Sequence, residues 1–176
     1  YKLSCKFDGP NQFANHTHDQ ECRESVYSVI IPSKEMPTPP PVAEASKYMV
    51  YELPLEAPSF GSSTIAVSPY DPEASPYGWH DLDGQDGVDN TTLQGNNAYA
   101  FNDNDGNYQA DSEVDGGQDL VFDKVFDQSL EPQESKEAAA VNLFYMVNKM
   151  HDFSYHFGFD EQSGNFELNN YGKGGQ

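Results

Sequence analysis

The sequence predicts an α+β fold, in which short strands come first and one long helix follows. Between residues 48 and 126, β-favouring residues gather in four short runs separated by glycine, asparagine, aspartate and proline. From residue 135 onwards, apolar residues recur at intervals of three and four, which is the period of an α-helix. Strands followed by one long helix indicate that the helix packs on an antiparallel sheet.

Residues 1–31 precede this region and are predicted to form a short separate unit. It holds the two cysteines of the chain, Cys5 and Cys22. A disulfide between them would stabilise the fold by about 3 kcal/mol in the chain-entropy model. A small zinc site that adds His16 and His18 is the alternative, although it lacks the close Cys-x-x-Cys pair typical of such sites.

Residues 32–46 are predicted to be an extended linker. Five prolines fall between positions 32 and 41, and no helix or central strand accommodates so many. The rest of the chain, residues 47–176, is then the main domain. Its expected strands cover residues 48–53, 64–67, 98–101 and 120–126.

The long helix is expected to run from Ser135 to Phe157. Ser135 can cap its first turn, and Gly158 can take the left-handed conformation that ends a helix. One face carries six large apolar residues: Leu143, Met146, Val147, Met150, Phe153 and Phe157. Other faces are apolar as well, so we expect protein to cover the helix around much of its circumference.

Two histidines of this helix, His151 and His156, invite a catalytic interpretation. His151 and Asp152 are adjacent, however, and adjacent residues point to different sides of a helix, so we expect no bond between them. A structural role is therefore the expectation for both histidines. Trp79 is likewise expected to anchor a loop.

The charge balance excludes several classes of function. The chain has 29 acidic and 9 basic residues, a formal net charge of -20. Nucleic acids and anionic membrane surfaces require a basic surface, so neither is an expected partner. No apolar run approaches the ~20 residues that a membrane-spanning helix needs. An acidic, secreted, extracellular protein is the simplest class, and Asn15 and Asn90 each begin an Asn-x-Thr glycosylation sequon.

Two acidic loops, at residues 80–87 and 102–107, resemble calcium-binding loops in composition. Carboxylates that alternate with other residues before a glycine supply the oxygen ligands that calcium prefers. Asp81, Asp83 and Asp86 are the candidate ligands in the first loop. Neither loop follows the EF-hand pattern, and ordinary turns in which aspartate bonds its own backbone are the alternative.

The chain resembles the fungalysin family in four blocks that occur in the family's order: SPYDPEASPYGWHD (68–81), QGNNA (94–98), DLVFD (119–123) and NLFYMVNKMHDFSYHFGFDEQSGNFELNNYGKGG (142–175). The resemblance covers residues 47–176. Fungalysins are secreted zinc metalloendopeptidases with a thermolysin-like catalytic unit and a restraining propeptide. The resemblance therefore implies the β-rich N-terminal lobe of such a unit, with one long helix, acting on proteins or peptides.

The resemblance also implies that the catalytic centre lies outside this chain. A fungalysin binds zinc through a His-Glu-x-x-His motif on a helix, and none of the five histidines here begins that motif. We expect the zinc ligands downstream of Gln176, no catalytic or zinc-binding residue in this chain, and an inactive fragment. The alternative is a non-enzymatic secreted module for calcium-dependent adhesion or carbohydrate binding.

Overall fold

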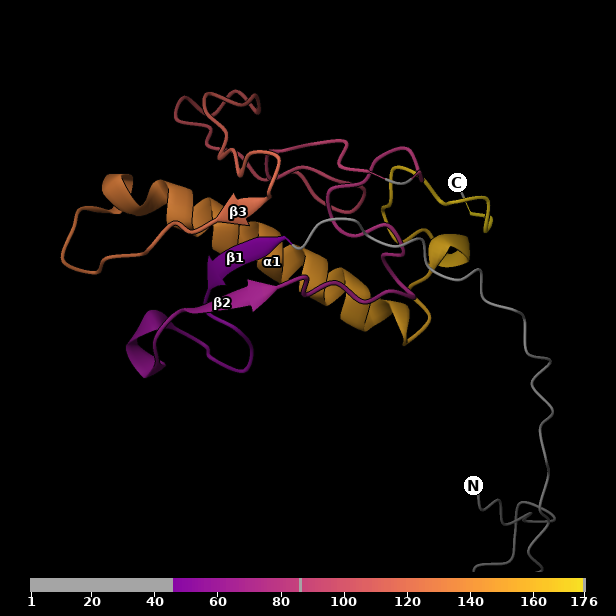
Figure 1. Cartoon of the computed structure of the whole chain (residues 1–176), viewed down its shortest axis with the longest axis horizontal. Helices are drawn as coiled ribbons and strands as arrows, with labels where there is room; N and C mark the ends of the chain where they lie inside the picture. Colours follow the sequence, from indigo (N-terminus) through magenta and orange to yellow (C-terminus); the bar gives the residue numbers. More distant parts are fainter. Residues whose placement is uncertain (1–45, 86, 176) are drawn as a thin grey trace, which may run out of the picture. The chain divides into compact units, whose positions relative to one another are not determined.

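The computed structural model describes residues 46–85 and 87–175 (Figure 1). The predictions for Cys5, Cys22 and Asn15, for the calcium ligand Asp86, and for the linker up to residue 45 lie outside the described residues.

A small sheet of three strands forms the β part, in the order β2-β1-β3. The strands are β1 (Lys47–Val50), β2 (Thr64–Val67) and β3 (Val121–Phe122). β1 and β2 are antiparallel, with Lys47 opposite Val67, as the sequence predicts. β3 runs parallel to β1, so the expectation of a purely antiparallel sheet is wrong. A long crossover of loops between β2 and β3 brings β3 back in the same direction as β1.

The strand predicted at residues 98–101 does not form, and the strands predicted at 48–53 and 120–126 are shorter than expected. Only isolated bridges, such as Gln94 with Tyr99, occur between β2 and β3 within the described residues. The reason is local competition, because many backbone amides there donate to aspartate and asparagine side chains instead of a neighbouring strand.

The long helix α1 (Lys136–Tyr155) follows the 3₁₀ helix η2 (Pro132–Ser135). Ser135 makes no capping bond, contrary to expectation, because its hydroxyl donates to the carbonyl of Asp127 at 3.5 Å. Glu131 and Glu134 form a capping box at the start of η2. Gly158 has a φ of 94° and donates its amide to the carbonyl of Tyr155, so the predicted end is confirmed. Two further 3₁₀ helices are η1 (Pro58–Phe60) and η3 (Glu161–Ser163).

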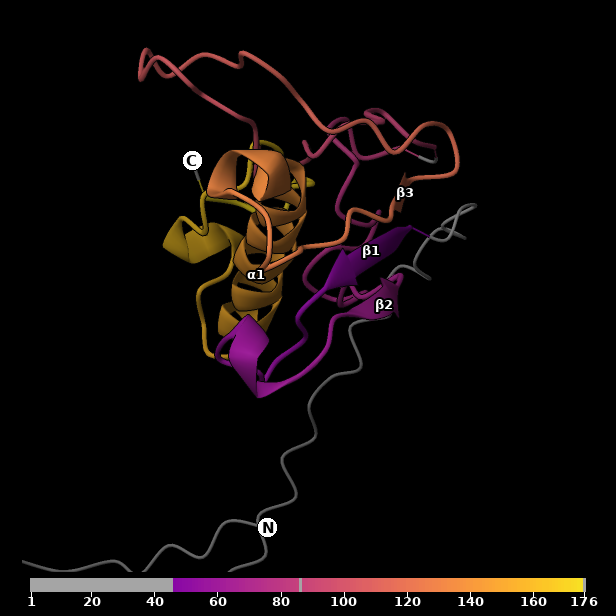
Figure 2. The same cartoon turned by 90° about the vertical axis from the view of Figure 1, so that its left-hand side faces the viewer.

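The core lies between the sheet and α1, which run alongside each other in Figures 1 and 2. Tyr48 from β1 stacks on Phe122 from β3, with ring centroids 5.3 Å apart, and on its other sides meets Phe144 of α1 and Trp79. These residues are buried, so aromatic packing joins β1, β3, α1 and the loop that carries Trp79. The predicted α+β class is confirmed. Within the described residues, no helix is both long and apolar enough to cross a bilayer.

Candidate functional site

A buried carboxylate on α1, Asp152, is the centre of a polar cluster under the loop of residues 71–80. One of its oxygens, Oδ2, accepts hydrogen bonds from the backbone amide of Asp71 at 2.9 Å and from the Trp79 indole at 3.0 Å. The other oxygen accepts the Ser75 hydroxyl at 2.8 Å. A buried carboxylate requires such donors, so Asp152 fixes the loop on the helix. This contact gives Trp79 the anchoring role expected for it.

His151 contacts carboxylates from two directions. Its Nδ1 lies 3.2 Å from Oδ1 of Asp152, so the expectation that these neighbours do not bond is wrong. Both side chains are buried, and their polar atoms meet although adjacent helix positions point in different directions. Its Nε2 lies 3.5 Å from Oε1 of Glu167. Burial raises the pKa of Glu167, whose carboxylate has no hydrogen-bond partner among the described residues.

The loop after α1 is held by a second buried carboxylate, Glu161. It forms an ion pair with Lys173 at 2.6 Å and accepts the Tyr155 hydroxyl at 3.2 Å. The Lys173 ammonium also donates to the Tyr155 oxygen at 3.2 Å. Three residues that are close in space but up to 18 positions apart therefore fix the path of residues 159–175.

Asn96 connects this final loop to the loop between β2 and β3. Its side-chain oxygen accepts the amide of Asn169 at 2.6 Å, and its side-chain nitrogen donates to the Asn169 carbonyl at 2.9 Å. The polar cluster, which we define as Asn96, His151, Asp152, Glu161, Glu167 and Lys173, thus joins α1 to both loops. Its partners are up to 81 residues apart in sequence, and no local motif indicates them. Its hydrogen bonds and ion pair hold the two loops on α1.

The first acidic loop brings Asp81, Asp83 and Asp89 together, with one carboxylate oxygen of each within 4.8 Å of the others. Asp81 and Asp83 are two of the predicted calcium ligands, and Asp89 is one that the sequence analysis missed. Burial raises the pKa of Asp81, which accepts the Gly84 amide and the Tyr171 hydroxyl. Asp89 accepts hydrogen bonds from the backbone amides of residues 82 and 83. The loop therefore contains aspartates bonded to backbone amides as well as clustered carboxylate oxygens. The calcium assignment stays a prediction.

The second acidic loop has a similar arrangement in Asp103, Asp105 and Asp111. Asp103 accepts the backbone amides of Gly106 at 2.7 Å and Tyr108 at 2.9 Å. These bonds lower the pKa of Asp103, the bond from Tyr108 contributing most. The carboxylates of this loop are therefore used mainly to close its own turns.

The described glycosylation sequon begins at Asn90 in a partly exposed turn. Its side-chain oxygen accepts both the amide of Thr92 at 3.1 Å and the Thr92 hydroxyl at 2.9 Å. Its amide nitrogen, the atom to which a glycan is attached, donates to Gln94 at 2.8 Å. One of its two hydrogens satisfies that bond, and the other can be replaced.

The described histidines lie outside the two clusters of candidate metal ligands. His80 is buried beside the rings of Tyr48 and Phe122, its Nε2 lies 2.7 Å from the Tyr48 hydroxyl, and burial lowers its pKa to about 4. His151 lies inside the polar cluster, and the exposed His156 pairs with Asp71 at 3.0 Å. No group of three candidate metal ligands among the described residues contains a histidine.

Comparisons with known proteins match the same part of the chain. The family model of the fungalysin metallopeptidases (M36) matches residues 47–176. Extracellular metalloproteinase 2 of Trichophyton tonsurans is 34% identical over 140 residues, which are 75% of this chain and 21% of that protein. The proteins of the same name from Arthroderma gypseum and Trichophyton rubrum are each 36% identical, with the same coverage of both chains.

The matched relatives and the matched family model place the chain in the class of the metallopeptidases. Within that class, the chain belongs to the fungalysin family, through residues 47–176. The resemblance identified from the four sequence blocks is therefore confirmed. The chain spans about a fifth of the length of the curated relatives it matches.

Proposed function

We propose that this chain is the N-terminal part of the catalytic region of an extracellular zinc metalloendopeptidase that hydrolyses peptide bonds in proteins. The observation that carries the proposal is the family match over residues 47–176. Support for the location comes from the relatives, which are named extracellular metalloproteinases. The acidic composition, with a net charge of -20, agrees with such a location.

The zinc ion would be held by residues outside this chain, where it would activate water and polarise the scissile carbonyl. The residues described here have a different task. The polar cluster holds two long loops on α1, and this rigid arrangement gives the rest of the catalytic region a defined surface to pack on. The chain by itself is expected to be inactive, because the zinc motif is absent from its sequence.

Peptide hydrolysis by the complete gene product and by the 176-residue chain tests this proposal. We expect the complete protein to cleave an internally quenched peptide, to lose that activity with a zinc chelator and to regain it with zinc. The short chain should show none. The matched control is a Glu→Gln change in the expected His-Glu-x-x-His motif of the complete protein. A chelator-resistant activity, or zinc-dependent cleavage by the short chain, would contradict the proposal.

The division into residues 1–31, 32–46 and 47–176 belongs to the same proposal. The proline-rich linker would be the junction at which the enzyme's own propeptide is removed, because its proline content predicts an extended segment open to proteases. N-terminal sequencing of the secreted enzyme should then give a start within or shortly after residues 32–46. A start upstream of residue 32 would contradict it.

A non-enzymatic adhesion or carbohydrate-binding module is the alternative from another class. The clustered carboxylates of the two acidic loops are the observation that favours it. Such a module would bind glycans in a calcium-dependent manner and would show no peptidase activity in the complete protein. A glycan array in calcium and in chelator, run beside the hydrolysis assay, separates the two functions.

A further inference from the structure

One face of α1 is apolar and exposed in the described part of the chain. It carries Leu143, Val147, Met150, Phe153 and, just past the helix end, Phe157, which we call the apolar stripe. These side chains are between 42% and 76% exposed, whereas Val141, Phe144 and Tyr145 on the opposite face are buried. The spacing of three and four residues puts all five side chains on one side of the helix.

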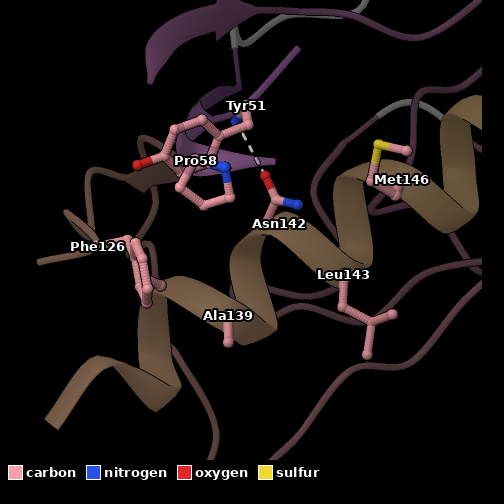
Figure 3. Close-up of a pocket in the computed structure, with 8 residues that line it drawn as sticks. Tyr51, Pro58, Phe126, Ala139, Asn142, Leu143 and Met146 are labelled. Carbon is pink, nitrogen blue, oxygen red and sulfur yellow. Dashed lines mark hydrogen bonds between the residues drawn. The ribbon is translucent and has the colours of Figure 1, made fainter. Parts of the chain in front are cut away.

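An apolar groove continues the stripe toward the start of α1 (Figure 3). It has a volume of about 330 Å³ and begins at Leu143 and Met146. Its other end is formed by Tyr51, Pro58 and Phe126, and Asn142 holds that edge by accepting the Tyr51 amide at 2.9 Å. The stripe and groove together form one uncharged surface on a chain whose net charge is -20.

Such a surface is costly to leave in water. Moving a large apolar side chain from water into a packed interior is favourable, so a covered stripe is more stable than an exposed one. Helices that face solvent normally show polar side chains there, and contiguous exposed apolar patches mark interfaces. The chain is acidic overall, but the residues that form this face include no carboxylate. The face therefore carries no negative charge that would repel an acidic neighbour.

We propose that the apolar stripe and groove form the docking surface for the remainder of the same catalytic polypeptide, which covers them with an uncharged apolar face of its own. The inference rests on the proposed function, and it specifies which surface receives the rest of the enzyme. The size of the relatives supports this occupant. They are about five times as long as the matched segment, and a chain of that length would supply an intramolecular partner at high effective concentration.

Thiol labelling of the complete gene product tests the proposal. Met150→Cys and Val147→Cys introduce a reporter on the stripe, and Leu130→Cys is the matched control because Leu130 and Met150 are similarly exposed, at 47% and 49%. The unsubstituted protein gives the background. We expect the stripe thiols of native monomers to react with a maleimide on the order of a hundredfold more slowly than the Leu130→Cys thiol, and equally fast in denaturant.

Three results would overturn the proposal. Stripe thiols that react as fast as the control show that the face is open. Protection that appears only at high concentration, together with a doubled mass in light scattering, assigns the face to a second copy. A complete gene product that ends at Gln176 removes the occupant. Peptide hydrolysis is measured on the same variants, so an active enzyme with open thiols refutes only the docking surface, and an inactive monomer with protected thiols refutes only the peptidase.

Discussion

At the scale of single residues, the carboxylate of Asp152 accepts hydrogen bonds from three donors of a distant loop. Without this carboxylate, these donors would need water as their partner. We expect Asp152→Ala to lower the free energy of unfolding of the protein by about 3 kcal/mol, because it leaves the Trp79 indole and two other donors buried without an acceptor. Asp152→Asn should cost less, since one acceptor oxygen remains. Urea denaturation measures both values.

The matched control for this pair is Asp123→Asn, an exposed aspartate whose replacement should leave the unfolding free energy nearly unchanged. Equal effects of Asp152→Asn and Asp123→Asn would show that Asp152 is not a structural centre.

The ion pair between His156 and Asp71 makes a pH-dependent contribution. The hydrogen bond to Asp71 raises the pKa of His156 above 6.5, so its stabilisation is full below 6.5 and is lost as pH rises through the raised value. Burial acts to raise the pKa of Asp71, but bonds from His156 and two amides lower it below 3.8. The Asp71 contribution is therefore lost as pH falls through that lowered value.

The pair should thus stabilise the protein most between about pH 4 and 6.5. We expect His156→Gln to reduce the thermal midpoint more at pH 5 than at pH 8, relative to the unsubstituted protein at each pH. Because His156 is exposed, the difference should also shrink in 1 M salt. A larger loss at pH 8 than at pH 5 would refute this assignment.

At the scale of elements, the end of α1 depends on one backbone conformation. Gly158 has a φ of 94°, and a Cβ added there would meet nothing within 4 Å. Gly158→Ala should therefore destabilise the protein by about 1 kcal/mol through backbone strain alone. Gly158→Asn is the matched variant and should cost less, because asparagine adopts the left-handed region more readily. Thermal unfolding of both proteins checks the order, which the reverse ranking would contradict.

The sequence predicted the existence of α1 well, but it did not predict which face is buried. Periodicity correctly placed a helix near residues 135–157, and Gly158 correctly marked its end. Apolar residues occur on both faces, however, so hydrophobicity alone could not select Phe144 and Tyr145 as the buried ones over Met150 and Phe153. The choice is made by packing against β1 and the loop of residues 71–80, which are distant in sequence.

The same reason explains what could and could not be predicted of the site. Asp81 and Asp83 were identified because a loop motif is local, and both join one cluster. Asp152 with Ser75, and Asn96 with Asn169, are pairs separated by 77 and 73 residues, which no spacing rule connects. The parallel pairing of β3 with β1 is equally non-local. The four family blocks indicated the family, and the comparisons confirmed it.

At the scale of the whole molecule, calcium should increase the thermal stability of this strongly acidic chain if the predicted loop site binds it. We expect millimolar calcium to raise the thermal midpoint by about 2–4 °C, because binding to the folded state alone stabilises it. A chelator should reverse the change. Sodium chloride at equal ionic strength controls for simple screening of the -20 charge.

Asp83→Asn should remove this calcium response, and Asp123→Asn should retain it, because only Asp83 belongs to the carboxylate cluster. An unchanged midpoint in calcium, or a response that sodium chloride reproduces fully, would leave only the turn interpretation for these loops.

Trp79 is the single tryptophan of this chain, and it lies where the sheet, the helix and a loop meet. Its indole touches Tyr48 and Tyr145 and donates to a buried carboxylate, so its emission depends on all of these neighbours at once. The molecule therefore contains its own optical probe: the quenching and emission wavelength of this tryptophan report the packing of the sheet, the helix and the loop without any attached dye.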